Sequence, residues 1–383
     1  MKAIINGTFL IGENEVKNAA LLFDSKILGL VPTDKIPDGC EVIDAQGLLV
    51  SPGLIDLHIH GYLGEDASDG NEEGIRIIAK GLLKNGVTSF LPTTMTVSWQ
   101  EIEAAFDNIR KLKAESAHAD FDGAQILGAH AEGPFVNPRR KGAQAESAIL
   151  PPDADKMLKH KDIIRILTMA PEMPGALEAI RKITEESDIV VSIGHTDATF
   201  EQANEGIKAG ASYVTHLFNA MSPLNHRNPG VVGAALQAPV TTELIADTFH
   251  VHPGLFSFLR DIKKEKLVLI TDCTRAGGLG DGEYTLGGQP IFVKGIECRL
   301  SNGTIAGSVL KLNQAVFNLR ENANLSNAQA VYHATHNSAL AIGALNEKGT
   351  LEEGKDADIV LFDQDMQAHK VFIKGTLKYT RGE

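Results

Sequence analysis

The segment from 52 to 61 reads Pro52-Gly53-Leu54-Ile55-Asp56-Leu57-His58-Ile59-His60-Gly61, an apolar run that ends in two alternating histidines. Side chains alternate along a β-strand, so we expect His58 and His60 to point to the same face. Two imidazoles placed in this way can bind one metal ion, although a pair of structural histidines would also fit this motif alone. If the run is the first strand of a barrel, the pair stands at the strand end where barrels place their active sites.

Seven further apolar runs typical of β-strands follow this segment, and helix-like stretches separate most of them. The runs lie at 87–93, 125–131, 163–170, 189–193, 213–217, 242–247 and 267–271. The helical patterns lie at 74–85, 99–115, 175–187, 199–209, 253–264, 308–323 and 327–341, and a glycine-rich loop occupies 277–282. This alternation predicts an α/β fold, a (β/α)₈ TIM barrel, with an open doubly wound sheet as the alternative.

Both chain ends have the character of all-β pieces. Short β-type runs occur at 2–5, 19–23, 26–32, 41–44 and 48–50, and again at 358–362 and 369–373. We predict that residues 1–51 and 351–383 pair into one small β-sandwich domain, with a metal-dependent barrel of residues 52–350 inserted between them. The length of 383 residues suits a large barrel with a small appendage.

Composition restricts the partners and the compartment. The formal net charge of −13 disfavours nucleic acid and anionic membranes as partners, and no apolar run is long enough to predict a membrane span. The N-terminal residues do not resemble a secretory signal. The three scattered cysteines, Cys40, Cys273 and Cys298, suit a reducing compartment. We therefore expect a cytoplasmic protein with no nucleic-acid or membrane partner.

Four more ionisable residues stand at the ends of other β runs: Glu132 after the third, His195 after the fifth, His216 after the sixth and Asp272 after the eighth. Because these ends converge on one mouth in a barrel, the set predicts a metal centre. Imidazole and carboxylate ligands without thiolates suit Zn, Fe or Mn.

A metal site of this kind lowers the pKa of bound water toward ~7. Asp272 could accept a proton from the water and deliver it to a leaving group. The combination favours hydrolysis of an amide-like bond or a related proton transfer. His130 shares a face with Glu132, and we favour a structural or outer role for it over metal binding.

The pattern at 52–61 resembles the amidohydrolase superfamily, in which a metal-bearing barrel carries a small β-sandwich built from both chain ends. The N-acetylglucosamine-6-phosphate deacetylase family is resembled more closely by four strings taken together: His130-Ala131-Glu132-Gly133-Pro134-Phe135, Gly194-His195-Thr196, Thr215-His216-Leu217-Phe218-Asn219-Ala220-Met221 and Thr271-Asp272. The resemblance runs over essentially the whole chain. It implies cleavage of the acetamide of N-acetyl-D-glucosamine 6-phosphate to D-glucosamine 6-phosphate and acetate, in amino-sugar catabolism and cell-wall sugar recycling.

The same resemblance implies a ligand set for a divalent cofactor, as one or two ions per subunit. Glu132, His195 and His216 would hold the main metal, with Glu132 at a strand position where many relatives use a carbamylated lysine. His58 and His60 would complete a second site.

Catalytic and substrate-binding roles are also implied by the resemblance. Asp272 matches the general acid/base, and His250 matches the histidine that polarises the acetyl carbonyl. Arg227 resembles a phosphate-binding arginine that the neighbouring subunit donates, which implies a homodimer. Gln144 stands where some relatives have a histidine, and it could bond a hydroxyl or phosphate oxygen without carrying charge. The other positions matched to sugar contacts are Ala143, Asn219, Ala220, Ile305, Ala306 and Gly307.

Two other functions are compatible with parts of the pattern. A cyclic-amide hydrolase or dipeptidase would share the barrel, but such enzymes commonly have a bridging lysine where this chain has Glu132. A scaffold that only binds sugar phosphate or stores metal would need none of the proton-transfer machinery, and Asp272 is present. Taken alone, Arg227 could be a surface charge and His250 a buried core histidine.

Overall fold

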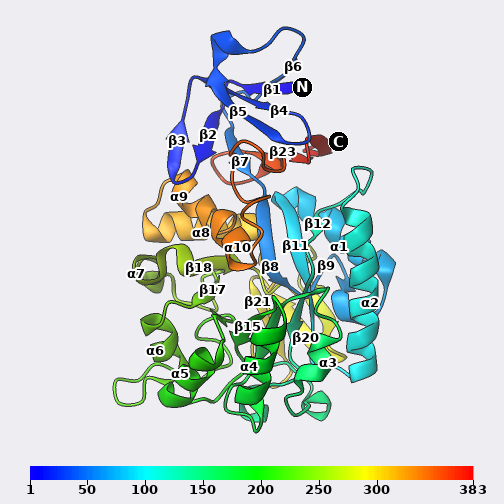
Figure 1. Ribbon diagram of the computed structural model, residues 1–383, viewed down its shortest axis with the longest axis vertical. Coiled ribbons are helices and arrows are strands. Elements are labelled where there is room, and N and C mark those ends of the chain that lie inside the picture. Colours follow the sequence, from blue (N-terminus) through cyan, green and yellow to red (C-terminus); the bar gives the residue numbers. More distant parts are fainter. Residues whose placement is uncertain (383) are drawn as a thin grey trace.

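Eight parallel strands form the barrel of this computed structural model, which describes residues 1–382 (Figure 1). In order around the barrel they are β8 (Leu54–Ile59), β11 (Val87–Thr94), β13 (Ala129–Glu132), β14 (Ile164–Met169), β15 (Val190–Ile193), β16 (Tyr213–Val214), β17 (Thr241–Ile245) and β18 (Leu267–Ile270). The first and last strands meet where the Asp272 N–H donates to the His58 carbonyl at 2.8 Å and Ile59 bridges Cys273. The predicted (β/α)₈ barrel is confirmed.

The third predicted run is divided in the structure. A short strand β12 (Gln125–Ile126) pairs with β11 before β13 begins. Gly128 lies between the two pieces with φ 150°, a conformation in which a Cβ would meet the Ile163 carbonyl. The break therefore depends on a glycine inside an otherwise apolar run.

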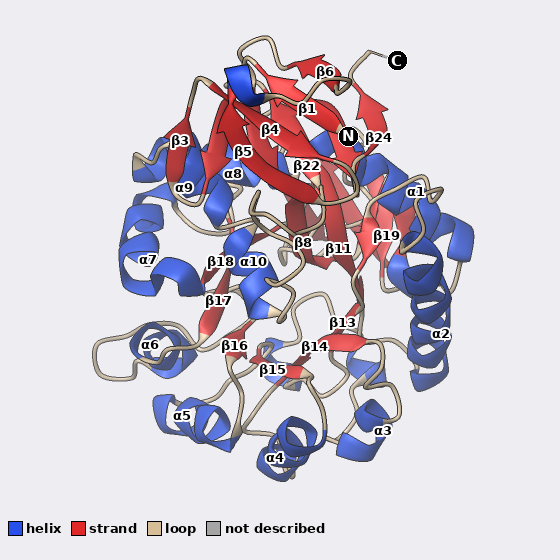
Figure 2. Ribbon diagram, turned by 45° about the horizontal axis from the view of Figure 1, so that its top comes forward, coloured by secondary structure: helices blue, strands red, loops and turns tan. Residues whose placement is uncertain are grey.

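Helices surround the barrel on its outer side (Figure 2). They are α1 (Glu72–Leu82), α2 (Trp99–Ser116), α3 (Ala154–Leu158), α4 (Ala176–Glu186), α5 (Phe200–Ala209), α6 (Gly230–Gln237), α7 (Phe256–Lys263), α8 (Leu312–Ala323), α9 (Asn327–Tyr332) and α10 (His336–Ala341). The predicted single helix at 327–341 is two helices, broken at Thr335 with φ −130° and ψ −83°. Helices α3 and α6 were not predicted.

The two chain ends form the β-domain, which is confirmed as a pair of sheets beside the barrel (Figure 1). Strand β7 (Leu49–Pro52) pairs with β22 (Ile359–Phe362), so both ends share one sheet. The six-stranded sheet also contains β2 (Thr8–Ile11), β3 (Asn14–Val16), β23 (Ala368–Ile373) and β24 (Thr376–Thr380), and the four-stranded sheet contains β1 (Lys2–Ile5), β4 (Ala19–Phe23), β5 (Ile27–Pro32) and β6 (Glu41–Asp44). The boundaries after residues 51 and 350 stay a prediction.

A third, smaller sheet lies next to the barrel mouth and was not predicted. It consists of β19 (Gly282–Leu286), β20 (Gln289–Lys294) and β21 (Glu297–Leu300) in antiparallel order. Its buried side chains form a separate apolar cluster with Met95, Ala143 and Ala306. The small sheet is thereby attached to segments that line the mouth.

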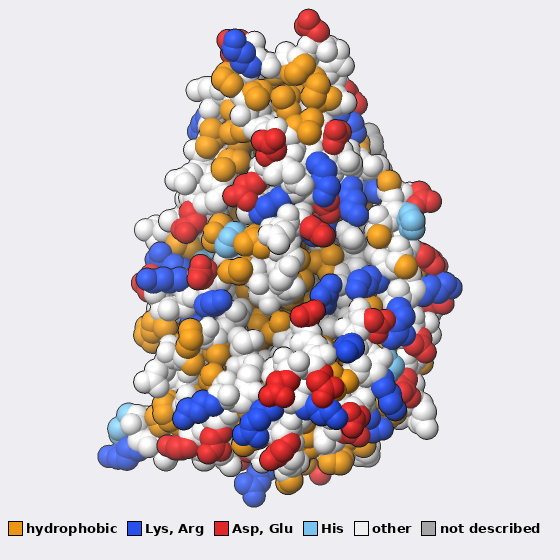
Figure 3. Space-filling view, in the orientation of Figure 1, with side chains coloured by type: hydrophobic (Ala, Val, Ile, Leu, Met, Phe, Trp, Pro, Cys, Tyr) orange, Lys and Arg blue, Asp and Glu red, His pale blue; other side chains and the backbone are white. Residues whose placement is uncertain are grey.

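The surface carries both signs of charge. Figure 3 shows acidic and basic side chains interspersed over the barrel helices of one face, so the net charge of −13 does not gather into a single acidic area there. Among residues 1–382, no helix is long and apolar enough to cross a membrane.

Candidate metal centre

The predicted ligands all stand at one end of the barrel strands. His58 lies within β8 and His60 directly follows it, and Glu132 is the last residue of β13. His195, His216 and Asp272 each lie two residues beyond the end of their strands, β15, β16 and β18. The side chains converge into two adjacent groups, Glu132 with His195 and His216, and His58 with His60 and Asp272; within each group the ligand atoms lie within 4.8 Å of one another.

Glu132 joins the two groups. Its Oε1 lies 3.1 Å from His195 Nε2 and 3.0 Å from His216 Nε2. Its Oε2 lies 3.2 Å from His60 Nε2. One carboxylate thus faces both groups.

Three of these residues have left-handed backbone conformations, with φ 47° at His195, 29° at His216 and 50° at Asp272. Such residues cost about 1–3 kcal/mol each and tend to cluster at functional sites. Each lies where the chain leaves a strand and turns, and the turn directs its side chain into the mouth.

The outward nitrogens of His58, His60 and His195 lie against acceptors, whereas His216 Nδ1 is buried without a hydrogen-bond partner among the residues that the structure describes. His195 Nδ1 lies 2.9 Å from the Arg140 carbonyl, and His60 Nδ1 lies 3.2 Å from the Thr93 carbonyl. Because a carbonyl can only accept, Nδ1 carries the hydrogen and Nε2 presents its lone pair to the mouth. This arrangement fits a divalent metal ion.

The field of the site favours positive charge. Burial alone would raise the pKa of Glu132, but His195 and His58 hold it well below its usual value. Burial opposes ionisation of Asp272 too, yet His58 and His60 lower its pKa to about 2. Burial disfavours charge on His60, but Asp272 and Glu132 raise its pKa well above the usual value. A metal ion would take the place of these protons.

A cavity of about 300 Å³ opens above the two ligand groups. His250, Ala143, Gln144, Asn219, Ala220, Ile305 and Gly307, all predicted substrate contacts, line it. Met95, Phe218, Leu286 and Thr304 also line it and were not predicted. Ala306 is fully buried behind the lining, in the cluster of the small sheet. No lysine or arginine lines the cavity within the part of the chain that the structure describes.

His250 is oriented by a carboxylate that the sequence reading did not single out. Its Nδ1 lies 2.6 Å from Asp247 Oδ2, and Asp247 Oδ1 accepts the backbone N–H of His250 at 2.8 Å. Nε2 is thus the nitrogen available to the cavity. The neighbouring His252 is exposed and caps the short helix at Pro253–Leu255 instead.

Neither Gln144 nor Arg227 has a free polar group directed into the cavity of its own chain. Both polar atoms of the Gln144 side chain are engaged: Nε2 donates to Glu132 Oε2, and Oε1 accepts the Thr96 N–H, each at 2.6 Å. Arg227 lies in an exposed loop that precedes α6, at the edge of a separate hollow.

His130 occupies the outer position that the sequence favoured. Its Nδ1 donates to the Leu57 carbonyl at 3.0 Å, and its Nε2 lies 2.7 Å from Thr168 Oγ1. Burial, together with the positive charge of His58, lowers the pKa of His130 to about 3. His130 is therefore a neutral side chain whose two nitrogens are already in use.

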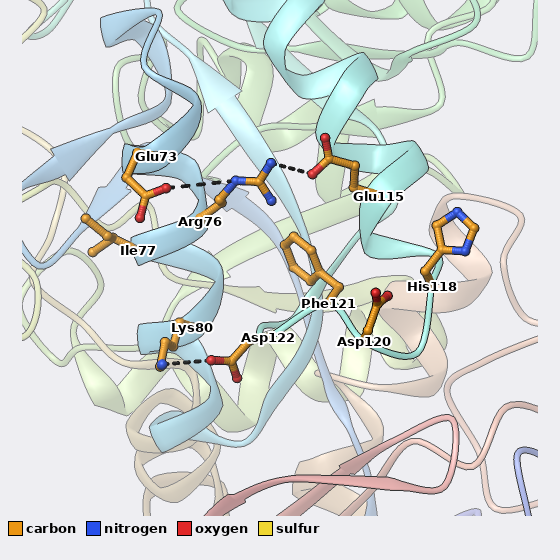
Figure 4. Close-up of a pocket in the computed structure, with 9 residues that line it drawn as sticks. All are labelled: Glu73, Arg76, Ile77, Lys80, Glu115, His118, Asp120, Phe121 and Asp122. Carbon is orange, nitrogen blue, oxygen red and sulfur yellow. Dashed lines mark hydrogen bonds and ion pairs between the residues drawn. The ribbon is translucent and has the colours of Figure 1, made fainter.

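A second hollow, of about 680 Å³, lies on the outer side of the barrel between α1 and α2 (Figure 4). Its two cations are paired with acids of the same hollow: Arg76 pairs with Glu115 and with Glu73, and Lys80 lies 2.7 Å from Asp122. It contains none of the strand-end residues. The chemistry therefore centres on the barrel mouth.

The chain is similar in sequence and in structure to known proteins. The sequence model of the Amidohydrolase family matches residues 49–378. N-acetylglucosamine-6-phosphate deacetylase of Bacillus subtilis (strain 168) is 40% identical, over 99% of this chain and 98% of that protein. N-acetylgalactosamine-6-phosphate deacetylase of Escherichia coli O157:H7 is 35% identical, over 89% and 90%. The crystal structure of N-acetylglucosamine-6-phosphate deacetylase from Pasteurella multocida superposes with a TM-score of 0.93 at 30% identity, over 99% of this chain and 100% of that one.

Proposed function

Because the chain belongs to the amidohydrolase family and is a hydrolase, we propose that it removes the acetyl group of N-acetyl-D-glucosamine 6-phosphate, forming D-glucosamine 6-phosphate and acetate. The observation that carries the proposal is the pair of ligand groups joined by Glu132 beneath a cavity of about 300 Å³. The activity named for the relatives at 40% and 30% identity supports the substrate.

Glu132, His195 and His216 would hold one divalent ion, and His58 with His60 would hold a second. Zn, Fe or Mn would suit this donor set of imidazoles and carboxylates. Once bound, such an ion would supply Lewis-acid polarisation and a water of lowered pKa. The acceptors on the outer nitrogens of His60 and His195 support the assignment, because they leave Nε2 free.

Asp272 would act as the base and then as the acid. Its carboxylate lines the cavity, and its low pKa keeps it ionised at neutral pH, so it can accept a proton from the attacking water. The same oxygen could then pass that proton to the departing sugar nitrogen. A free amine, rather than an amide anion, would leave.

His250 would stabilise the charge that develops on the acetyl oxygen during attack. It lines the cavity, and Asp247 holds its ring from the opposite side. The sugar would lie against Ala143, Asn219, Ala220, Ile305 and Gly307, and Ala306, buried behind them, would support this lining.

The phosphate requires a cation from outside the chain. The described cavity lining has no lysine or arginine, yet a phosphate carries negative charge. We therefore propose a homodimer in which each subunit supplies Arg227 to the other's cavity; the planar fork of donors suits phosphate.

An apolar helix face supports self-association near Arg227. Leu255, which caps the start of α7, recurs at helical spacing with Phe258 and Ile262 of that helix, and the three are 38%, 44% and 42% exposed. This helix packs beside α6, because Lys263 donates to the Ala235 carbonyl at the end of α6. The loop of Arg227 and the apolar face therefore lie on the same side of the barrel.

The proposed role is amino-sugar catabolism and cell-wall sugar recycling, in the cytoplasm. Three free cysteines, which are not paired with one another, suit a reducing compartment.

The test is release of acetate from three compounds by the metal-loaded protein. N-acetylglucosamine 6-phosphate should turn over best, its C4 epimer more slowly, and unphosphorylated N-acetylglucosamine poorly. Dipicolinate should remove the activity and added Zn²⁺ or Mn²⁺ should restore it. Equal rates with and without the phosphate, or hydrolysis of hydantoin or dihydroorotate instead, would overturn the proposal.

A further inference from the structure

Glu243 is a fully buried carboxylate in the middle of β17, and no step above uses it. It lies in the barrel interior beneath the metal centre. Its Oε2 is 3.0 Å from His58 Nδ1 and accepts the backbone N–H of His216 at 2.8 Å. One oxygen therefore contacts both ligand groups.

The contact with His58 fixes which nitrogen faces the mouth. Glu243 Oε2 already accepts the His216 N–H and acts as an acceptor toward His58 as well, so Nδ1 of His58 carries the hydrogen. His58 Nε2 is then directed at the centre, 3.3 Å from His60 Nε2 and 3.4 Å from Asp272 Oδ1. A carboxylate behind a histidine in this way orients the ring and makes it a more basic metal ligand.

His58 differs in this respect from the other ligands. His60 and His195 are held by backbone carbonyls, which are neutral. At His58 the partner is instead a side-chain carboxylate, with Glu243 Oε2 3.0 Å from Nδ1. Among the three ligands His58, His60 and His195, only His58 has a carboxylate behind its ring.

The contact with His216 concerns the backbone. His216 has φ 29°, and the next residue donates its N–H to the main-chain carbonyl of Glu243 at 3.0 Å. Two hydrogen bonds to a single residue thus hold the chain where it leaves β16. Glu243 therefore orients a side chain in one group and supports the backbone in the other.

A third metal site at this place would be the competing interpretation. His58, His130 and Glu243 also have ligand atoms within 4.8 Å of one another. However, His130 already donates to Leu57 and bonds Thr168, so it has no free lone pair to direct at an ion without breaking one of these contacts.

We propose that Glu243 is a positioning residue that sets the ring orientation of His58 for metal binding and the backbone of His216 beside it. The inference rests on the proposed metal centre, but not on the identity of the substrate. A merely structural role would lower thermal stability without changing metal affinity.

The test compares Glu243→Ala and Glu243→Gln with wild type in equilibrium dialysis against graded free Zn²⁺, with bound metal counted by mass spectrometry. Removing the partner of a metal-binding histidine typically costs about 10–100-fold in metal affinity. Glu243→Ala should therefore lower the affinity for one of the two zinc ions by this factor. Glu243→Gln retains an acceptor oxygen without the charge, and its zinc affinity should lie between those of wild type and Glu243→Ala. Thr168→Val, which removes a buried contact of His130, serves as the matched control and should leave zinc affinity unchanged.

A second readout follows the His58 ring itself. In the zinc-loaded protein, the protected Nδ1–H proton of His58, assigned by its loss in His58→Asn, should be visible by NMR in wild type, displaced in Glu243→Gln and lost in Glu243→Ala. Wild-type zinc affinity in both Glu243 variants, or an unchanged Nδ1–H signal in Glu243→Ala, would overturn the inference. Failure of the proposed deacetylation would appear separately, as a wild-type protein that binds zinc and releases no acetate.

Discussion

Gln144 donates its side-chain amide to Glu132, with 2.6 Å between Nε2 and Oε2. The donor is the residue that the sequence reading expected to contact a hydroxyl or phosphate oxygen. The acceptor is the carboxylate that faces both ligand groups, and the other end of the amide is fixed by Thr96. In this structure Gln144 restrains Glu132, and its role toward the substrate stays a prediction.

Gln144→Leu should therefore lower kcat more than it raises KM. The substitution removes the donor that orients Glu132 while keeping a similar volume, and loss of an outer partner costs about 10–100-fold in activity or metal affinity. Steady-state kinetics with N-acetylglucosamine 6-phosphate, together with zinc content, would check it. An increase confined to KM would show that Gln144 acts on the substrate instead.

Asp272→Asn should abolish turnover while leaving metal bound. The amide keeps an oxygen beside His58 and His60 but cannot accept the proton, and general acid–base catalysis contributes about 10²–10⁴-fold. The measurement is the single-turnover rate beside the metal content of the same preparation. A rate within a few-fold of wild type would remove Asp272 from the proton path.

Arg227→Ala should raise KM for N-acetylglucosamine 6-phosphate far more than for the unphosphorylated sugar, because only the phosphate needs the guanidinium. Comparable changes for both sugars would argue against phosphate recognition by Arg227.

Mixed dimers would test whether Arg227 acts across the interface. A subunit with Arg227→Ala keeps its own Asp272, and a partner with Asp272→Asn keeps its Arg227. At a substrate concentration well below the raised KM of Arg227→Ala, both parent proteins turn over slowly, and mixing them should restore one competent site in each mixed dimer. If Arg227 served its own chain, the mixture would stay as inactive as its parts.

The strand ends could be predicted because each is local in the sequence. His58, Glu132 and Asp272 each close an apolar run, and the barrel topology brings such ends together whatever the loops do. The barrel fold and the convergence of the ligand groups both followed from this rule.

Elements whose stability depends on packing were missed. Helix α6 begins Gly-Val-Val-Gly, which has low helix propensity, and it forms where Lys263 caps its last carbonyls. The small sheet contains short alternations, at Ile291 with Val293 and at Cys298 with Leu300, that could have been read as strands.

Long-range partners were missed for a different reason. Glu243 and His58 are 185 residues apart, and the sequence around either residue contains no pattern that indicates the other. The one local signal was an acidic residue inside an otherwise uncharged strand, Thr-Thr-Glu-Leu-Ile. A buried charged residue that has no oppositely charged residue close to it in the sequence must have a partner far away in the sequence, because buried charges are paired.

The stability of the β-domain should depend on a buried charge cluster. Lys348 lies between Asp356 and Asp358, at 2.9 and 2.6 Å, and Asp356 also pairs with Lys26. Lys348→Ala would leave the buried Asp358 without a cation and Asp356 with Lys26 alone. We expect it to lower the free energy of unfolding by about 3–5 kcal/mol, the usual cost of removing one partner of a buried pair. Urea unfolding at pH 7 would measure the loss.

The pH dependence of that loss has a definite sign. Burial opposes ionisation of Asp356, but Lys348 and Lys26 lower its folded pKa below the unfolded value of about 3.9. This contribution is present above pH ~4 and is lost as the pH falls through the folded pKa.

Burial likewise opposes charge on Lys348, but Asp358 and Asp356 raise its folded pKa above about 10.4, so its contribution is lost as the pH rises through that pKa. The difference in unfolding free energy between wild type and Lys348→Ala should therefore be greatest near neutrality and shrink toward both extremes. A difference that stayed constant from pH 7 down to pH 2.5 would show that lost packing, rather than charge, accounts for the effect.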